Sequence, residues 1–514
     1  MFDNIGVLTM AENENNNNEN KPKGSNNGYG VALFGRRVIY ADVDEITPEN
    51  IMGVLYDAMP KHIANKCDIN YLYNYYKGKQ PILERVKEVR PEICNRVVVN
   101  LAYDIVDFKV SYLLGTPFTY VAVGEKANPV NVLNGYMNQV GKKGLDKDLV
   151  EWNHICGTAY RYVQALKPEM VSKGDAPFDL DTLDPRTTFV IYSSTFKKKR
   201  LAAVTYTISD TDGQVISFVV YTPTKIYTFK AQNKFDTLEN FTKSRDGFVV
   251  ENNALGEIPI FEYPANNARL GAFEIVLPLL DALNRITSND VDGVEQIIQS
   301  FLKFINCEVD LAALEDLRRY GAIKIKSTDG QQADVDTVKT DYTFEGANIT
   351  KEDIYKNILL ICGMPIPGNG KSISANNGAM LISSGYSKTE SKARSSEMMF
   401  EASERLMLKL VLKIVETIGE KLDIRSSDIT VKTERTNNEN LQVKTQALCE
   451  MLNTQKVHPK LAFEACGLFS DPENAYLISE IYYNEQLEKW QPKNVPNEDG
   501  VIDDEETDEK VRTD

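Results

Sequence analysis

The sequence predicts an α+β fold that is mainly helical and divided into several regions. The chain has 514 residues, and single hydrophobic cores stop growing at about 250–300 residues, after which chains divide. Its apolar periodicity is helical before and after one central stretch, residues 159–265, where the period changes to two. Apolar residues make up 42% of the chain and charged residues 26%, which is ordinary for a soluble globular protein.

Both ends of the chain have compositions typical of disorder. Residues 1–30 are rich in asparagine and almost free of periodic apolar residues, so they cannot bury enough surface to offset the entropy cost of ordering. Met10 is an alternative start within this segment. Residues 491–514 hold nine acidic and three basic side chains, so part of the net charge of −16 lies in one tail. We therefore expect folded structure between residues 31 and 490.

Residues 46–158 show helical periodicity. The clearest helix is expected from Arg96 to Leu114, and Gly115 and Pro117 then end it. Upstream, the tyrosines of YLYNYYKGKQPI form either a stacking surface for a peptide or base or, more commonly, the packing of a helix end. The apolar positions of the helix follow alternating steps of three and four residues: Val98, Leu101, Ile105, Phe108 and Tyr112.

Residues 159–265 contain seven short runs rich in β-branched and aromatic residues, which predict an antiparallel meander. Asp212-Gly213 lies between two of the runs and is a strong hairpin signal. The basic run at 197–200 is either a phosphate contact or, more commonly, a solvated turn. The expected strands are AYRYVQAL, RTTFVIYS, RLAAVTYTIS, QVISFVVYT, KIYTFKA, GFVVEN and IPIFEYP.

Helical periodicity returns after residue 265. A helix is expected over 271–305, because an apolar stripe continues along it for many turns and needs a partner helix or a partner subunit. Residues 306–346 then predict a small mixed insert with a short helix and two strands, AIKIKS and ADVDTVKT. A second helix is expected from Thr350 to Cys362. The stripe consists of Val276, Leu280, Leu283, Ile286, Val294, Ile297, Phe301 and Ile305.

The stretch that follows, GMPIPGNGKSISANNGA, holds two prolines and four glycines and predicts a flexible loop. It leads into a very long helix, about 379–421, that is polar in its first half and apolar on one face in its second. A half-polar long helix usually lines a solvent-filled space or a subunit contact. One strand, DITVKTER, and a group of helices at 437–488 complete the ordered chain.

No motif with catalytic chemistry stands out, so we expect no enzyme activity, no cofactor and no metal. GNGKS at 368–372 is similar to a phosphate-binding loop, but GxxxxGKS needs glycine at position 365, where this chain has Pro365. The chain has neither a GxSxG elbow nor a CxxC pair, and its three histidines lie far apart. Four carboxylates after residue 271 do not meet at one point of a helix and predict a solvated or lumen-facing strip: Asp281, Asp290, Asp292 and Glu295.

Three long segments carry a family resemblance through their order and spacing. They are NRVVVNLAYDIVDFKVSYLLGTPFTY at 95–120, GEIPIFEYPANNARLGAFEIVLPLLDALNRITSNDVDGVEQ at 256–296, and TVKTERTNNENLQVKTQALCEMLNTQKVHPKLAFEACGLFSDPENAYLISEIYYNE at 430–485. Together they resemble the portal proteins of tailed bacteriophages, specifically the family found in long-tailed phages of Gram-positive bacteria. The resemblance implies a ring, usually of twelve subunits, around a central channel.

The resemblance also implies an order of regions along the chain. These are a wing at 31–265, a first stem helix at 266–305, a clip at 306–347, a second stem helix at 348–364, a tunnel loop at 365–378, a long helix bridging wing and crown at 379–429, and a crown at 430–490.

By resemblance, the function is a structural one at a capsid vertex: a channel for DNA packaging and ejection, with no catalysis of its own. The implied partners are further copies of the chain, non-specific double-stranded DNA, the terminase large subunit, head-completion or adaptor proteins, and the major capsid and scaffold proteins. The expected location is the virion, after synthesis in the host cytoplasm, since the first 30 residues lack a secretory signal. No run of about 18 apolar residues offers a membrane span.

Two sets of residues are candidates for contact with these partners. Lys371 is the single cation of the tunnel loop, and its charge and position favour a weak contact to DNA backbone. The tunnel-loop candidates are Gly368, Asn369, Gly370, Lys371, Ser372, Ser374, Asn376 and Asn377. The clip candidates are Arg318, Arg319, Lys324 and Lys326.

The net charge of −16 argues against a sequence-reading DNA-binding protein, which normally has a basic footprint. This charge is compatible with a channel. DNA that slides through a channel must not be bound tightly, and each phosphate that a basic side chain neutralises adds affinity. Two other function classes stay open. A nucleic-acid enzyme or motor subunit needs a nucleotide loop or a metal-binding carboxylate set. A tail or baseplate component does not need the helix–insert–helix–loop–long helix order of 271–421.

Overall fold

The computed structural model divides the chain into two compact units, Met1–Asn437 and Asn438–Asp514. It combines helices with mainly antiparallel sheets, which confirms the α+β prediction. The residues that the structure describes are 33–115, 117–123, 126–209, 214–298, 301–305, 307–308, 315, 326–327, 334–338, 344–366, 386–419, 421–432, 441–454, 456–469 and 472–490.

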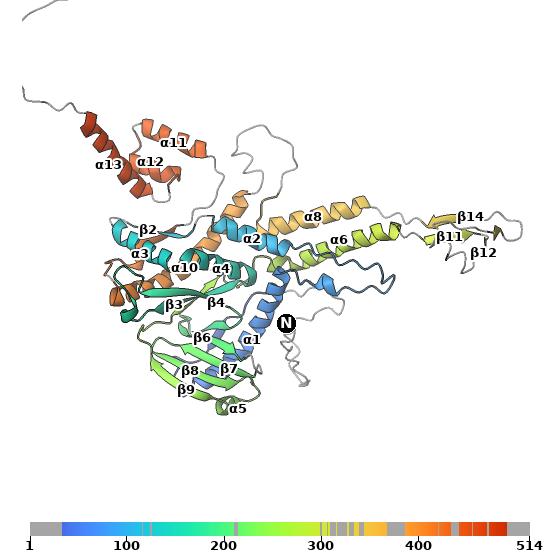
Figure 1. Ribbon diagram of the computed structural model, residues 1–514, viewed down its shortest axis with the longest axis horizontal. Helices are drawn as coiled ribbons and strands as arrows, with labels where there is room; N and C mark the ends of the chain where they lie inside the picture. The colour runs from blue at the N-terminus through green and yellow to red at the C-terminus, as the bar shows by residue number, and fades with distance from the viewer. Residues whose placement is uncertain are drawn as a thin grey trace, which may run out of the picture. The chain divides into compact units, whose positions relative to one another are not determined.

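A six-stranded sheet forms one side of the first unit, in the order β1-β5-β6-β7-β8-β9 (Figure 1). The antiparallel part is the predicted meander, and pairing of Ile208 with Ile216 confirms the predicted hairpin, although Asp212-Gly213 lies outside the described residues. β1 joins in parallel, beside β5. The N-terminal half of α1 (Ile51–Tyr76) and the short α5 (Leu238–Lys243) share a core with this sheet. The strands are β1 (Ile39–Ala41), β5 (Thr188–Ser193), β6 (Arg200–Ile208), β7 (Val215–Tyr221), β8 (Lys225–Gln232) and β9 (Asp246–Asn252).

The prediction of a single meander is wrong for the first and last runs, which form a second sheet. β3 (Thr158–Ala165) lies between β10 (Ile260–Pro264) and β4 (Phe178–Leu183), and both pairings are antiparallel. The sequence did not predict β4, FDLDTL. Only alternate residues such as Phe178 and Leu180 are buried, and the aspartates between them weaken the strand signal.

The largest core surrounds this second sheet, with α2 (Leu101–Leu113), α3 (Ala127–Gln139), α4 (Lys142–Cys156) and α10 (Tyr386–Ile418) packed about it (Figure 1). The region 46–158 is not helical throughout, because β2 (Thr119–Ala122) pairs with β15 (Ile429–Lys432). Tyr73 stacks on Trp152 with ring centroids 5.1 Å apart, which favours the interpretation that the tyrosine-rich segment packs a helix end.

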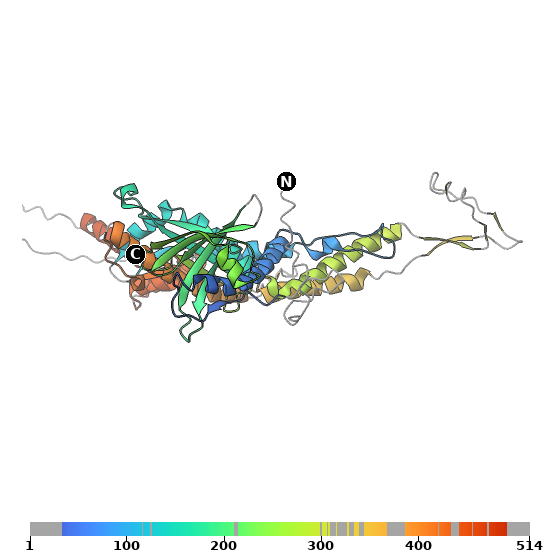
Figure 2. The ribbon, with the colours of Figure 1, turned by 90° about the horizontal axis from the view of Figure 1, so that it is seen from below.

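α6 (Leu277–Ile298) and α8 (Phe344–Cys362) run side by side as a helical hairpin (Figures 1 and 2). The predicted helix over 271–305 is too long, since Phe301–Ile305 form β11 and pair with β14 (Asp334–Val338). Aromatic and β-branched side chains in this segment suit a strand as well as a helical stripe. β12 (Cys307–Glu308) pairs with β13 (Lys326–Ser327), within the predicted strand AIKIKS.

The second unit contains α11 (Leu441–Asn453), α12 (Pro459–Cys466) and α13 (Pro472–Trp490) around a small core that includes Leu448 and Phe463. It begins at Asn438, whereas residue 430 is the expected start of the crown, because β15 belongs with β2 in the first unit. The 3-10 turns are η1 (Pro81–Glu84), η2 (Pro168–Met170), η3 (Glu274–Val276) and η4 (Ser426–Asp428).

Candidate functional site: the α6–α8 hairpin and its anchor

The hairpin is anchored at its base by Glu274, in the 3-10 turn that precedes α6. One carboxylate oxygen accepts hydrogen bonds from the Gly35 backbone N–H at 2.8 Å and from Arg36 Nη2 at 2.6 Å. The other oxygen accepts from the Gly271 N–H at 2.8 Å. Both charged side chains are buried, and removal of one partner from a buried pair is strongly destabilising. The hairpin therefore starts from a fixed point in the body.

The segment before this anchor, residues 268–270, packs closely against two glycines. A Cβ atom at Gly35 would lie 1.9 Å from the carbonyl oxygen of Ala268, and one at Gly157 would lie 2.1 Å from that of Arg269. Both glycines have φ near +80°, a conformation that other residues adopt at a cost. Only glycine at these positions allows the segment leading into α6 to lie on the body.

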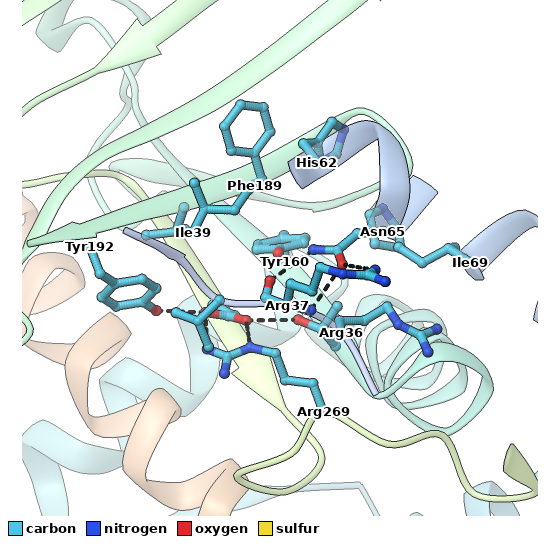
Figure 3. Close-up of a pocket in the computed structure, with 15 residues that line it drawn as sticks. Arg36, Arg37, Ile39, His62, Asn65, Ile69, Tyr160, Phe189, Tyr192 and Arg269 are labelled. Atoms are coloured by element: carbon cyan, nitrogen blue, oxygen red, sulfur yellow. Dashed lines mark hydrogen bonds and ion pairs between the residues drawn. The ribbon is translucent and has the colours of Figure 1, made fainter. Parts of the chain in front are cut away.

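Arg269 also binds Glu262 through two parallel hydrogen bonds, of 2.6 Å from Nε and 2.9 Å from Nη2 (Figure 3). The Tyr192 hydroxyl donates to the same carboxylate at 2.6 Å. Burial opposes ionisation of Glu262, but Arg269 and the hydroxyl outweigh it and hold the pKa of this carboxyl below its usual value. The pair thus ties the loop before α6 to β10 and β5.

The cavity drawn in Figure 3 lies beside this cluster and includes Arg36, His62, Asn65 and Tyr160 in its lining. Its volume is about 20 Å³, which is space for roughly one water. The His62 ring bonds to the Arg186 carbonyl and the Tyr206 hydroxyl, so it is a packed core histidine. The cavity is too small for a substrate.

An extended segment, residues 95–99, lies along α6 and replaces the start of the helix predicted from Arg96. The backbone N–H groups of Asn95, Val97 and Val99 donate to side chains of α6 at 2.7, 3.0 and 2.7 Å. The acceptors, in that order, are Asp292, Ser288 and Asn284, all buried.

The match of this segment to α6 is geometric. Alternate residues of an extended chain are about 6.6 Å apart, and residues four apart on a helix rise by about 6 Å. Each N–H pointing toward α6 therefore meets a polar side chain on the next turn. We call residues 95–99 and their three acceptors the strap. Side chains of α6 accept the hydrogen bonds of the N–H groups of Asn95, Val97 and Val99, so residues 95–99 do not require helical hydrogen bonds. The helix α2 therefore starts at Leu101.

The strap corrects the prediction that the carboxylates of α6 form a solvated strip. Asp292 is 3% exposed and forms ion pairs with Arg85 at 2.9 Å and Lys87 at 3.1 Å. Burial opposes its ionisation, but the Asn95 N–H and both cations outweigh it and lower its pKa. Asp281 likewise accepts a hydrogen bond from Tyr75 at 2.8 Å. These groups hold α6 to the body.

The apolar stripe of α6 changes character along its length. Val276, Leu280 and Leu283 are buried in the main core, as a stripe predicts. Farther along, Val294 is 47% exposed, and Ile349 of α8 is 58% exposed. These two side chains are about half exposed, although the strap covers the neighbouring Asp292, so they are available for contact.

A buried network of charges fixes α10 to the sheet and to α4. Lys142 Nζ lies 2.6 Å from Asp146 and 2.9 Å from Glu404, and Arg161 lies 2.5 Å from the other oxygen of Asp146. The hydroxyls of Tyr120 and Tyr263 donate to Glu404 at 2.5 and 2.6 Å. Burial opposes ionisation of Glu404, but these cations and hydroxyls together hold its pKa low.

Sequence reasoning missed this network. A usable signal existed in α10, where Glu404 lies on the same face as Phe400, Leu408 and Val411, at helical spacing. A carboxylate within an apolar stripe indicates a buried partner, but nothing local identifies Lys142 as that partner.

Most predicted contact residues lie outside the described part of the chain. This applies to every tunnel-loop candidate from Gly368 to Asn377 and to Arg318, Arg319 and Lys324 of the clip. The backbone of Lys326 lies in β13, paired with Glu308. Among the described residues, no three side chains suited to bind a metal come together. None of the described helices has the length and apolarity to cross a membrane.

Comparison with known proteins identifies the family. No curated protein matches the sequence. One solved structure that the chain matches is described as the neck of a native GTA particle computed with C12 symmetry; the match has 11% identity and a TM-score of 0.38, over 72% of this chain and 90% of that one. The model of the family "Phage portal protein, SPP1 Gp6-like" matches residues 59–494. The match covers most of the sequence, and the chain therefore belongs to the SPP1 Gp6-like family of phage portal proteins.

Proposed function

We propose that this portal-family chain assembles into a closed ring at one capsid vertex, and that the ring is the channel for DNA packaging and ejection. The observation that carries the proposal is the α6–α8 hairpin, which is rigidly anchored at its base and leaves apolar side chains exposed on its outer half. A closed ring covers such side chains, because each subunit buries one face of its hairpin on the next.

The charge balance supports a channel in which DNA slides. A net charge of −16 is unfavourable for tight phosphate binding. In this proposal the tunnel loop, residues 365–378, approaches the DNA, and Lys371 makes a weak contact that is repeated around the ring. Such a contact positions the DNA backbone and reads no sequence.

The clip, residues 306–347, is the proposed docking surface for the terminase large subunit and the head-completion proteins, with Arg318, Arg319, Lys324 and Lys326 as candidate contacts. The portal itself performs no catalysis in this proposal, and a separate terminase supplies the chemical energy. The major capsid and scaffold proteins are proposed neighbours in the virion.

The first test is the mass and shape of the purified protein, measured by light scattering after size-exclusion chromatography and by negative-stain electron microscopy. Closed rings of about twelve subunits with a central hole are expected. A small closed dimer or an open filament would contradict the proposal, and a tail-component function would then be favoured.

The two contact regions have separate tests in packaging reactions with the complete particle. Lys371→Glu is expected to slow DNA packaging while rings still form, and packaging at the normal rate would reject the DNA contact. Deletion of residues 306–346 is expected to leave a folded subunit that does not hold head-completion proteins. Full tail joining by this deletion would reject the clip assignment.

A further inference from the structure

A second cavity, unrelated to the one in Figure 3, lies among α2, α4, α10 and the end of α8. Its volume is about 30 Å³, which is room for roughly two waters. Lys109, His154 and Lys392 line it, together with the hydroxyls of Thr389 and Ser396. No carboxylate of the described residues is part of the lining. The cavity is therefore small, lined by helices, positively charged and partly open to solvent.

Lys109 has no counterion in this environment. Its ammonium makes no hydrogen bond or ion pair with any residue that the structure describes, although the neighbouring helix α10 brings Lys392 close to it. Burial lowers the pKa of Lys109, and Lys392 adds to that effect. Lys109 is partly buried, and a charge withdrawn from water is costly unless a counterion pairs with it. An anion bound beside Lys109 would therefore be stabilised.

The two other nitrogen-bearing side chains have free donors toward the same space. Lys392 Nζ donates to the Ile361 carbonyl at the end of α8, which leaves two of its three N–H groups. The ring of His154 makes no hydrogen bond with a described residue. Burial and the charge of Lys109 lower the pKa of His154 to about 3, so its ring is neutral and offers one N–H.

We propose that this cavity binds a small inorganic anion of halide size between the ammonium groups of Lys109 and Lys392. The anion supplies the charge that Lys109 lacks, and the cavity volume of about 30 Å³ accommodates one ion of this size. Because Lys392 also caps α8, the bound anion links α2, α10 and the end of α8. Gly363 completes the fit, since a Cβ atom there would lie 2.4 Å from Lys392 Cδ.

The test is the thermal stability of the full-length protein as chloride or bromide replaces gluconate at constant ionic strength. The wild-type Tm is expected to rise with halide concentration, as for any ligand that binds only the folded state. Lys109→Met is expected to abolish this rise and to increase the Tm in gluconate, because it removes an unpaired charge that is partly buried. A purely structural lysine would not produce this pair of effects.

Lys388→Met is the matched control. Lys388 lies one turn before Lys392 and donates to the Leu360 carbonyl at 2.7 Å, but it does not line the cavity. Its removal is expected to lower the Tm slightly while the response to halide is kept. An equal halide response in wild type, Lys109→Met and Lys392→Met would overturn the proposal, because general salt effects would then explain it.

A direct measurement covers the case in which a variant does not fold. The line width of the chloride NMR signal is expected to broaden with wild-type protein and to narrow again when bromide competes. The absence of broadening would mean that only water occupies the cavity. A Tm that rises with phosphate or sulfate but not with halide would also reject the site.

Discussion

At the level of single residues, Gly157 shows how one position constrains the whole base of the hairpin. We expect Gly157→Ala to destabilise the fold by at least about 1–3 kcal/mol from its backbone conformation alone, and by more because its Cβ would lie 2.1 Å from Arg269 O. Gly144→Ala is the control, since it lies in α4 with open space around it, and it is expected to stabilise by about 0.5–1 kcal/mol. Denaturant unfolding of both variants measures the difference, and equal stabilities would contradict the close approach.

Glu404 tests the buried network in the same way. Glu404→Gln leaves Lys142 without one of its two carboxylate partners and is expected to cost about 3–5 kcal/mol. Glu401→Gln, one turn earlier, removes only an exposed pair with Arg405 and is expected to cost less than about 1 kcal/mol. Chemical denaturation separates these outcomes. A small loss for both variants would show that the network is not important for stability.

His62 predicts a pH dependence. Burial lowers its pKa from 6.5 to about 3 in the folded state. The unfolded chain therefore binds more protons below pH 6.5, so the contribution of His62 to stability is full above that pH and is lost as the pH falls toward 3. When the pH falls from 7.5 to 5.5, the free energy of unfolding of wild type is expected to fall by about 1.4 kcal/mol more than that of His62→Gln. Parallel pH profiles of the two proteins would contradict the burial of a neutral ring.

At the level of elements, the strap predicts a local effect on α6. Ser288→Ala removes the acceptor of the Val97 N–H, and a buried donor without a partner costs about 1–3 kcal/mol. Hydrogen exchange at Val97 is expected to speed up, while exchange in the six-stranded sheet stays slow. Gln296 is exposed and lies two turns later on α6, and Gln296→Ala is expected to change neither measurement much. Unchanged exchange at Val97 in Ser288→Ala would show that the strap bond is absent in solution.

The elements also show where sequence patterns predict structure and where they do not. The meander from β5 to β9 follows from alternating apolar residues, because one buried face imposes a period of two. β4 was missed because aspartates, which are depleted in strands, occupy its exposed positions. The helix predicted from Arg96 began too early, since the N–H groups of Asn95, Val97 and Val99 are satisfied by α6, which no local pattern reveals.

At the level of the whole molecule, the exposed half of the hairpin predicts the behaviour of the assembly. Val294→Glu is expected to leave a folded subunit that no longer forms rings, because a charge in the subunit contact stays unpaired. Val249→Glu is the control, since Val249 has similar exposure, 49% against 47%, but lies in β9. Light scattering gives the mass of each variant. Normal rings from Val294→Glu would place the subunit contact elsewhere.

The sequence by itself determined the α+β class, the helix–insert–helix order after residue 265 and the family resemblance, which the match over residues 59–494 bears out. These follow from local periodicity and from segment order, both of which are legible in one chain. Only the tertiary structure decided the pairing of β2 with β15, the sheet of β10, β3 and β4, the strap and the buried charges around Glu404. The physical reason is distance along the chain: the pairing of β2 with β15, the strap and the contacts of Glu404 join groups that lie at least 141 residues apart. A burial pattern shows that a partner exists without showing which one.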